Sequence, residues 1–218
     1  MITCAMCDDE LPFAEQLRSF VMAYAKKRRV ELQAETFASA EELLEEIENG
    51  AGFEILFLDI EMRKMDGIEL GKKLRERSYQ TLIIYVSGYD QYMRQLFEAE
   101  PFRFLSKPLK QEELENVLDK AFERISRDIV YLESNKRKII VHTVRGEYEY
   151  YHKLDEEEEE LLAISADFVR IHKAYLVNME HVEAFQYEKL ALRDGTILSI
   201  SEAHRANVRS RFWEWGSE

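Results

Sequence analysis

Hydrophobic and polar positions follow two alternating patterns along the first 126 residues of the chain. Short, almost continuous apolar runs predict buried strands, and each run is followed by a stretch in which apolar residues recur at helical spacing. We expect strands at 2–7, 30–37, 54–59, 81–87 and 102–106, and helices at 12–28, 39–49, 67–77, 89–98 and 110–126. This alternation is typical of an α/β fold, a doubly wound five-stranded parallel sheet covered by helices.

The pattern changes near residue 129, where short stretches rich in β-branched and aromatic residues are separated by turn signals. The acidic run DEEEEE at 155–160 predicts the start of a helix with a solvated face, because acids early in a helix complement its dipole. Further strands are expected at 168–172, 175–178, 181–188 and 189–200, with a hairpin turn at Asp194-Gly195 and a closing helix near 202–212. The chain therefore divides into residues 1–126 and a mostly β domain at 129–218.

Composition agrees with two soluble domains. The chain has 218 residues, 46% of them hydrophobic, which is enough apolar material for two cores. No apolar run approaches the ~20 residues of a membrane helix, and the apolar start MITCAMC lacks the basic lead of a signal peptide. We therefore expect a cytoplasmic protein without a membrane partner, in which Cys4 and Cys7 are buried structural thiols.

Polar residues stand at the carboxyl ends of four predicted strands: Asp8, Asp9, Asp59, Ser87 and Lys107. In a doubly wound sheet these ends converge on one edge, where such folds bind ligands. Three neighbouring carboxylates repel one another, which predicts a hard divalent cation such as Mg²⁺. With the cation bound, Asp59 could attack a phosphoryl group whose oxygens Ser87 and Lys107 stabilise. A single aspartate at a strand end is usually a turn former, but five such residues at four ends favour the functional interpretation.

The segments CDDE, FLDIEM, MDG, VSG and FLSKP resemble the receiver domain of bacterial two-component response regulators, over residues 1–126. The resemblance implies a flavodoxin-like fold in which a sensor histidine kinase phosphorylates Asp59. Asp9 and Asp59 would ligate Mg²⁺ directly, with help from Asp8 and the backbone carbonyl of Glu61. Phe104 falls at the family's aromatic switch position, although it would serve equally as a core residue. Residues 63–65 read RKM where these receivers often carry proline.

The segments VYLES, RIHKAYLVN and LRDGTILSIS resemble the LytTR-type DNA-binding domain, over residues 129 to about 213. The resemblance implies a β-rich fold whose loops enter successive major grooves of double-stranded promoter DNA. Each basic residue taken alone could be an ordinary surface charge. The expected contacts, placed by the family's contact loops, are Lys136, Arg137, Lys138, His172, Lys173, Arg205 and Arg209.

Some contact positions depart from the family pattern. Lys173-Ala174 replaces the usual Arg-Ser, and lysine lacks the two-pronged hydrogen bonding of arginine. Glu202 and Ala203 stand where basic residues are common, and a carboxylate there would repel phosphates. The chain carries a formal charge of -13, which argues against broad non-specific nucleic-acid binding without excluding a local basic surface. A homodimer on paired half-sites would double the contacts.

The residues therefore favour a transcriptional response regulator in which phosphorylation of Asp59 controls dimerisation and promoter binding. Such a protein is not an enzyme, beyond its own phosphorylation and dephosphorylation. One alternative is a phosphorylation-dependent regulator whose second domain is a protein-interaction module with little or no DNA binding. An aspartyl-phosphate hydrolase would carry a second aspartate two residues after the nucleophile, where this chain has Glu61. A flavin or nucleotide site is disfavoured because no glycine-rich loop follows the first strand.

Overall fold

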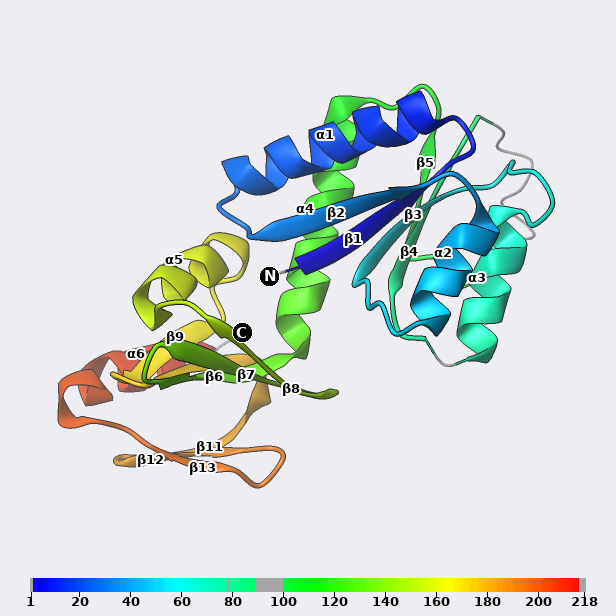
Figure 1. The fold of residues 1–218 in the computed structure, drawn as a ribbon. Coiled ribbons are helices and arrows are strands. Elements are labelled where there is room, and N and C mark those ends of the chain that lie inside the picture. The colour runs from blue at the N-terminus through cyan, green and yellow to red at the C-terminus, as the bar shows by residue number, and fades with distance from the viewer. Residues whose placement is uncertain (1, 78, 89–99, 216–218) are drawn as a thin grey trace. The chain divides into compact units, whose positions relative to one another are not determined.

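The computed structural model describes residues 2–77, 79–88 and 100–215 and divides the chain into two compact units, Met1–Ala121 and Phe122–Glu218 (Figure 1). The division falls inside helix α4 (Gln111–Asp128), whereas the sequence prediction ended the first domain at residue 126. No helix in these described ranges is long and apolar enough to span a bilayer. Each unit has its own hydrophobic core.

A parallel five-stranded sheet forms the centre of the first unit, in the order β2-β1-β3-β4-β5. This order is that of flavodoxin-like doubly wound folds and confirms the predicted fold class. The predicted helix at 89–98 lies outside the described residues. The strands are β1 (Ile2–Cys7), β2 (Leu32–Phe37), β3 (Ile55–Asp59), β4 (Leu82–Ser87) and β5 (Arg103–Ser106), and the helices are α1 (Leu11–Lys27), α2 (Ala40–Glu48), α3 (Gly67–Glu76) and α4.

Local signals explain where two of these helices begin. The Ser39 hydroxyl accepts a hydrogen bond from the Glu42 backbone N–H at the start of α2, and the Asp66 carboxylate accepts one from the Glu69 N–H at the start of α3. Such caps satisfy N–H groups that lack a partner within the helix. The caps, with the strand ends before them, fix where each helix leaves the sheet.

The helices cover both faces of the sheet. Apolar side chains of α2 and α3, including Leu43 and Leu74, pack against β1, β3 and β4 in one buried cluster. Leu56 and Leu58 of β3 belong to the same cluster. Helices α1 and α4 lie together on the opposite face (Figure 1), joined by an ion pair between Arg28 and Asp119. All five residues of β3 are buried, as expected of the central strand of a covered parallel sheet.

The second unit is mostly β, as predicted. A five-stranded sheet has the order β8-β7-β6-β10-β9, and a three-stranded antiparallel sheet has the order β11-β12-β13. The Asp194-Gly195 hairpin turn is confirmed, with Gly195 at φ 88°, in the left-handed region that favours glycine. The elements are β6 (Ile129–Asn135), β7 (Lys138–Thr143), β8 (Gly146–Tyr151), α5 (Leu154–Ile164), β9 (Phe168–His172), β10 (Tyr175–Asn178), η2 (Met179–His181), β11 (Val182–Gln186), β12 (Lys189–Leu192), β13 (Ile197–Ser199), η3 (Glu202–His204) and α6 (Arg205–Trp215).

Two apolar clusters hold the second unit together. Helix α5 packs on one face of the five-stranded sheet through Leu154 and Leu161. The three-stranded sheet and α6 pack on a second cluster that includes Val169, Leu190 and Val208. This layering leaves the turns at the ends of the strands at the surface, where loops can carry function.

Candidate functional site

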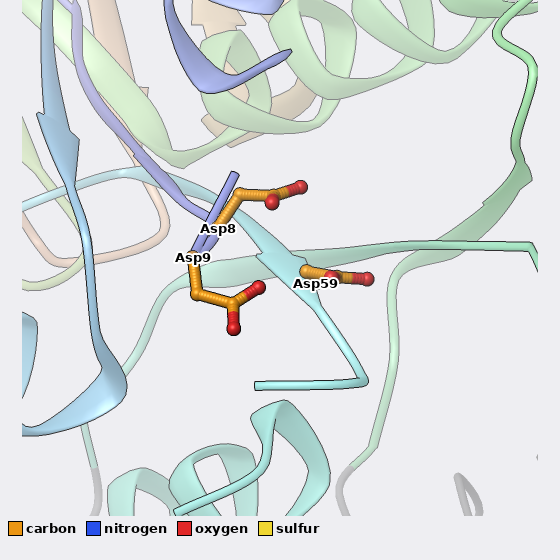
Figure 2. Close-up of side chains that lie close together, drawn as sticks. All are labelled: Asp8, Asp9 and Asp59. Atoms are coloured by element: carbon orange, nitrogen blue, oxygen red, sulfur yellow. The ribbon is translucent and has the colours of Figure 1, made fainter. Parts of the chain in front are cut away.

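Three carboxylates gather where β1 and β3 end, at the edge of the sheet predicted to bind ligand. Asp8 and Asp9 follow β1 directly, and Asp59 is the last residue of the neighbouring strand β3. Figure 2 shows the three side chains close together, and one oxygen of each lies within 4.8 Å of the others. The strand pairing therefore brings together residues about fifty positions apart in the chain.

Lys107 bridges two of the three acids. Its Nζ donates a hydrogen bond to Asp8 Oδ2 at 2.8 Å and lies 3.3 Å from Asp59 Oδ2. The ammonium also lies 4.3 Å from the ring centre of Phe13 in α1, a cation–π contact that the sequence did not indicate. The backbone N–H of Lys107 donates to the Ser87 carbonyl, so β4 and β5 set the position of this side chain.

Burial makes the charge at this site costly. Asp8 and Asp59 are 3% and 7% exposed. Burial, together with the neighbouring charge of Asp8, raises the pKa of Asp59 to about 6 in spite of Lys107. Burial opposes protonation of Lys107, but its hydrogen bond to Asp8 and the charge of Asp59 raise its pKa. One ammonium compensates three carboxylates only in part, so the site fits a hard cation with oxygen ligands.

Gly67 is a further residue of the site that sequence reasoning missed. A Cβ at this position would lie 2.1 Å from the backbone oxygen of Asp59, so only glycine allows α3 to begin so close to the end of β3. The Gly67 N–H donates to the Ile60 carbonyl at 3.1 Å and ties the helix start to the acid-bearing segment. The MDG motif contained the signal, but its steric reason appears only in three dimensions.

The remaining residues predicted for this site lie on β4 and β5 and just after β3. Ser87 is 1% exposed at the end of β4, next to β3. Glu61 follows Asp59 by two positions and is exposed. Phe104 in β5 is half-buried against the core cluster and pairs in register with Tyr85 of β4. Arg63, which was not predicted, lies 3.8 Å from Asp9 with a 94% exposed side chain.

The predicted DNA-contact residues of the second unit lie on three segments. Lys136 and Arg137 form the exposed turn between β6 and β7, while His172 ends β9 and Lys173 follows it in the turn to β10. These two turns are neighbours, because the Ser134 N–H donates to the Ala174 carbonyl at 2.8 Å.

The third segment, η3 and the start of α6, is also adjacent. The Ser201 N–H donates to the Ile171 carbonyl at 3.0 Å, which places η3 beside the end of β9. Glu202 lies in η3 and is exposed, so a carboxylate stands next to the predicted contact turns. Arg209 lies further along α6 and is exposed.

Two of the predicted contacts already have acidic partners. Lys138 forms an ion pair with Glu149 on the neighbouring strand β8. Arg205 pairs with Glu188 at 3.0 Å and covers the Tyr187 ring at 5.0 Å. These two side chains therefore present less free positive charge than the sequence suggested. Within the described ranges, Lys136, Arg137, Lys173 and Arg209 form no such ion pair.

A doubly wound sheet with an acid cluster at its carboxyl edge, followed by a β-rich unit, is the arrangement that the two resemblances in the sequence imply for a two-domain signalling regulator. The protein-family model of the response regulator receiver domain matches residues 5–119 of the sequence. The family model of the LytTR DNA-binding domain matches residues 124–213. The chain belongs to the response regulators that carry an N-terminal receiver domain and a C-terminal LytTR DNA-binding domain. Both resemblances noted in the sequence are thereby confirmed.

Two relatives align with this chain over most of their length. The sensory transduction protein LytT of Bacillus subtilis is 23% identical, over 96% of this chain and 98% of the relative. The transcriptional regulatory protein LytR of Staphylococcus aureus is 24% identical, over 62% of this chain and 68% of the relative.

Solved structures match the receiver half. The REC domain of AraT, a response regulator from Geobacillus stearothermophilus, is 28% identical with a TM-score of 0.50, covering 57% of this chain and 95% of that chain. The response regulatory domain of mrkE from Klebsiella pneumoniae is 18% identical with the same TM-score, covering 55% and 94%. The second likeness shows the fold alone.

Proposed function

We propose that Asp59 accepts a phosphoryl group from a sensor histidine kinase and that this modification controls promoter binding by the second domain. The observation that carries the proposal is the acid cluster at the carboxyl edge of the sheet, in which Asp8 and Asp59 are buried and bridged by Lys107. Asp59 combines low exposure with a position on the central strand, where it faces both the other acids and the ammonium. The names of the two relatives, a sensory transduction protein and a transcriptional regulatory protein, support a role in signal-dependent regulation.

In the proposed reaction, a carboxylate oxygen of Asp59 attacks the phosphorus of a phosphohistidine. A P–O bond forms, the P–N bond breaks, and the histidine nitrogen leaves with the electron pair and takes up a proton. Mg²⁺ held by Asp8, Asp9, Asp59 and the backbone carbonyl of Glu61 would neutralise charge between carboxylates and phosphoryl oxygens. Ser87 and Lys107 hydrogen-bond the transferred oxygens.

The output in this proposal is a change of population between two receiver conformations. Phe104 moves with Ser87 and reports the phosphoryl group to the surface, which promotes a homodimer on paired half-sites. The protein is not an enzyme beyond its own phosphorylation and dephosphorylation. Steady turnover of small phosphate esters would contradict this part of the proposal, because it would indicate a hydrolase.

Phosphorylation is tested by intact-mass measurement after incubation with acetyl phosphate. We expect the mass of one phosphoryl group to appear with Mg²⁺ and to be absent in EDTA and in Asp59→Asn. Asp66→Asn is the matched control, since Asp66 is exposed outside the cluster and asparagine also caps a helix. Persistent labelling of Asp59→Asn would overturn the assignment of the acceptor.

A second candidate function is a protein-interaction module in place of DNA binding. It is favoured by the exposed carboxylate of Glu202 beside the contact turns and by the pairing of Arg205 with Glu188. A gel-shift assay on the promoter region of its own operon, with and without phosphodonor, separates the two functions. Retardation that increases with phosphodonor supports DNA binding, whereas no retardation in either state at low salt supports the interaction module.

A further inference from the structure

Arg170, on β9 of the second unit, holds together two parts of the chain that sequence reasoning treated separately. Its side chain is only 12% exposed. Nε donates to the His172 carbonyl and Nη2 to the Lys173 carbonyl, both at 2.8 Å. On the other side, Nη1 donates to Glu158 at 2.8 Å and Nη2 to Asp155 at 3.0 Å. One guanidinium therefore joins the acidic helix α5 to the turn between β9 and β10.

That turn, residues 172–174, is held by hydrogen bonds at every carbonyl. Arg170 binds the first two carbonyl oxygens, and the Ser134 N–H binds the third at 2.8 Å. The Ala174 N–H donates to Nδ1 of His172 at 3.1 Å. Because Nδ1 acts as an acceptor, the hydrogen of the neutral ring lies on Nε2, which remains a donor for a ligand.

We infer that Arg170 is a positioning residue for DNA recognition, which fixes the turn bearing His172 and Lys173, and that Asp155 and Glu158 hold its guanidinium in place. The inference rests on the proposed function, because it assumes that these two side chains meet DNA. It assigns part of the acidic run at 155–160 a role that the sequence did not suggest, since a solvated helix face was predicted there.

The chemistry of the contacts explains why arginine is needed. Four acceptors lie around one planar group, and the five N–H donors of a guanidinium in fixed directions suit such an arrangement. A lysine ammonium offers three donors from one point and does not reach both carbonyls and both carboxylates in the same geometry. The little-exposed positive charge also requires acidic partners, which α5 supplies.

Holding the turn before binding matters for affinity. A turn that is ordered in the free protein loses less conformational entropy when it meets DNA, and ordering one residue costs enough to weaken binding roughly tenfold. Base recognition depends on this order more than phosphate contact does, because hydrogen bonds to base edges require fixed donor positions. Loss of the Arg170 contacts should therefore reduce sequence discrimination more than general DNA affinity.

Removal of the two acids gives a test in which simple electrostatics and positioning predict opposite results. Asp155→Asn with Glu158→Gln removes two negative charges from a DNA-binding domain, which by charge alone would tighten binding. If the acids hold Arg170, specific binding weakens instead. Glu156→Gln with Glu159→Gln is the matched control, because it makes the same change of charge on the same helix at two exposed residues. Glu156 forms an ion pair with Lys153, whereas the acidic partners of Arg170 are Asp155 and Glu158.

The experiment uses the full-length, phosphodonor-treated protein and a duplex selected from a random pool by the wild type, with a scrambled duplex for comparison. We expect Arg170→Lys and the Asp155/Glu158 variant to bind the selected duplex roughly tenfold more weakly, while binding to the scrambled duplex is unchanged or tighter. The Glu156/Glu159 control should keep the wild-type ratio. Circular dichroism verifies that each variant is folded.

Two further readouts separate positioning from a general structural role. Amide exchange at residues 172–174 in the DNA-free protein should accelerate in both variants. His172→Ala should weaken wild-type binding but have little additional effect in the Arg170→Lys background, because the side chain is already misplaced. Specific binding that is retained or tightened in the Asp155/Glu158 variant, or unchanged exchange in the turn, overturns the inference. Failure of the wild type to enrich any sequence would instead overturn the proposed DNA binding.

Discussion

Ionisation of Asp59 should have a measurable cost for the stability of the receiver domain. Burial and the neighbouring Asp8 raise its pKa from an ordinary 3.8 to about 6. A carboxyl group whose pKa is raised in the folded state holds its proton more tightly there than in the unfolded chain. Stability therefore decreases as pH rises between these two values, and the full cost persists at higher pH in the absence of metal.

Asp59→Asn removes the charge and keeps the approximate shape of the side chain. The difference between 3.8 and about 6 corresponds to ~3 kcal/mol, because a tenfold change in an acidity constant is worth about 1.4 kcal/mol. We expect the variant, in EDTA near neutral pH, to exceed the wild type in free energy of unfolding by up to this amount. The difference should shrink towards zero below about pH 4, where the wild-type carboxyl is protonated in both states.

Urea denaturation followed by far-UV circular dichroism measures this difference, with amide exchange in β1 and β3 as a local readout. Both tryptophans, Trp213 and Trp215, belong to the second unit. The unfolding midpoint that their fluorescence reports is therefore an internal control and should be the same in Asp59→Asn and in the wild type. Mg²⁺ should stabilise the wild type and narrow the gap, because the cation binds the ionised acids of the folded state. Equal or lower stability of Asp59→Asn in EDTA at neutral pH would refute the reasoning.

Three further predictions concern packing and burial. Gly67→Ala should destabilise the receiver domain by about 1–3 kcal/mol in thermal denaturation and reduce labelling by acetyl phosphate, because its Cβ would lie 2.1 Å from a backbone oxygen. Gly52→Ala, where a Cβ meets nothing within 4 Å, is the control and should change neither quantity. Asn178→Leu should reduce the free energy of unfolding of the second unit by about 2 kcal/mol or more, because the buried amide donates a hydrogen bond to the Ile129 carbonyl at 2.9 Å. The unfolding midpoint measured by tryptophan fluorescence should therefore decrease, and an unchanged midpoint would contradict this. Cys4 and Cys7 are buried, and burial raises the pKa of both thiols, so neither should react with a disulfide reagent until urea is added.

The order of elements and the approximate place of the acid cluster could be predicted from the sequence. Apolar runs placed β1 and β3 within one residue of their observed bounds, and Asp8 and Asp59 stand at the ends of those strands. Parallel strands bring their carboxyl ends to one edge of a sheet, so membership of the cluster follows from the pattern alone. The hairpin at Asp194-Gly195 was equally predictable, because its dipeptide carries the required turn chemistry.

Pairing between side chains was not predictable in the same way. Lys138 and Arg205 were expected to contact DNA, but each has a carboxylate partner that is brought near by strand or turn pairing. The start of β2 at Leu32, two residues later than expected, follows a turn in which Arg29 has φ 58°. Sequence patterns report the face on which a residue lies, but they do not report which neighbour occupies the adjacent element.

The sequence by itself determined the two domains, the doubly wound sheet and the acids at its carboxyl edge, because these depend on local periodicity and on the strand ends. Only the tertiary structure decided that Lys107 bridges Asp8 and Asp59, that Gly67 must lack a Cβ, and that Arg170 ties the acidic helix to the 172–174 turn. Each of these contacts is a distance between separately formed elements. Such distances are set by the packing of whole elements against a core, which no short stretch of sequence encodes.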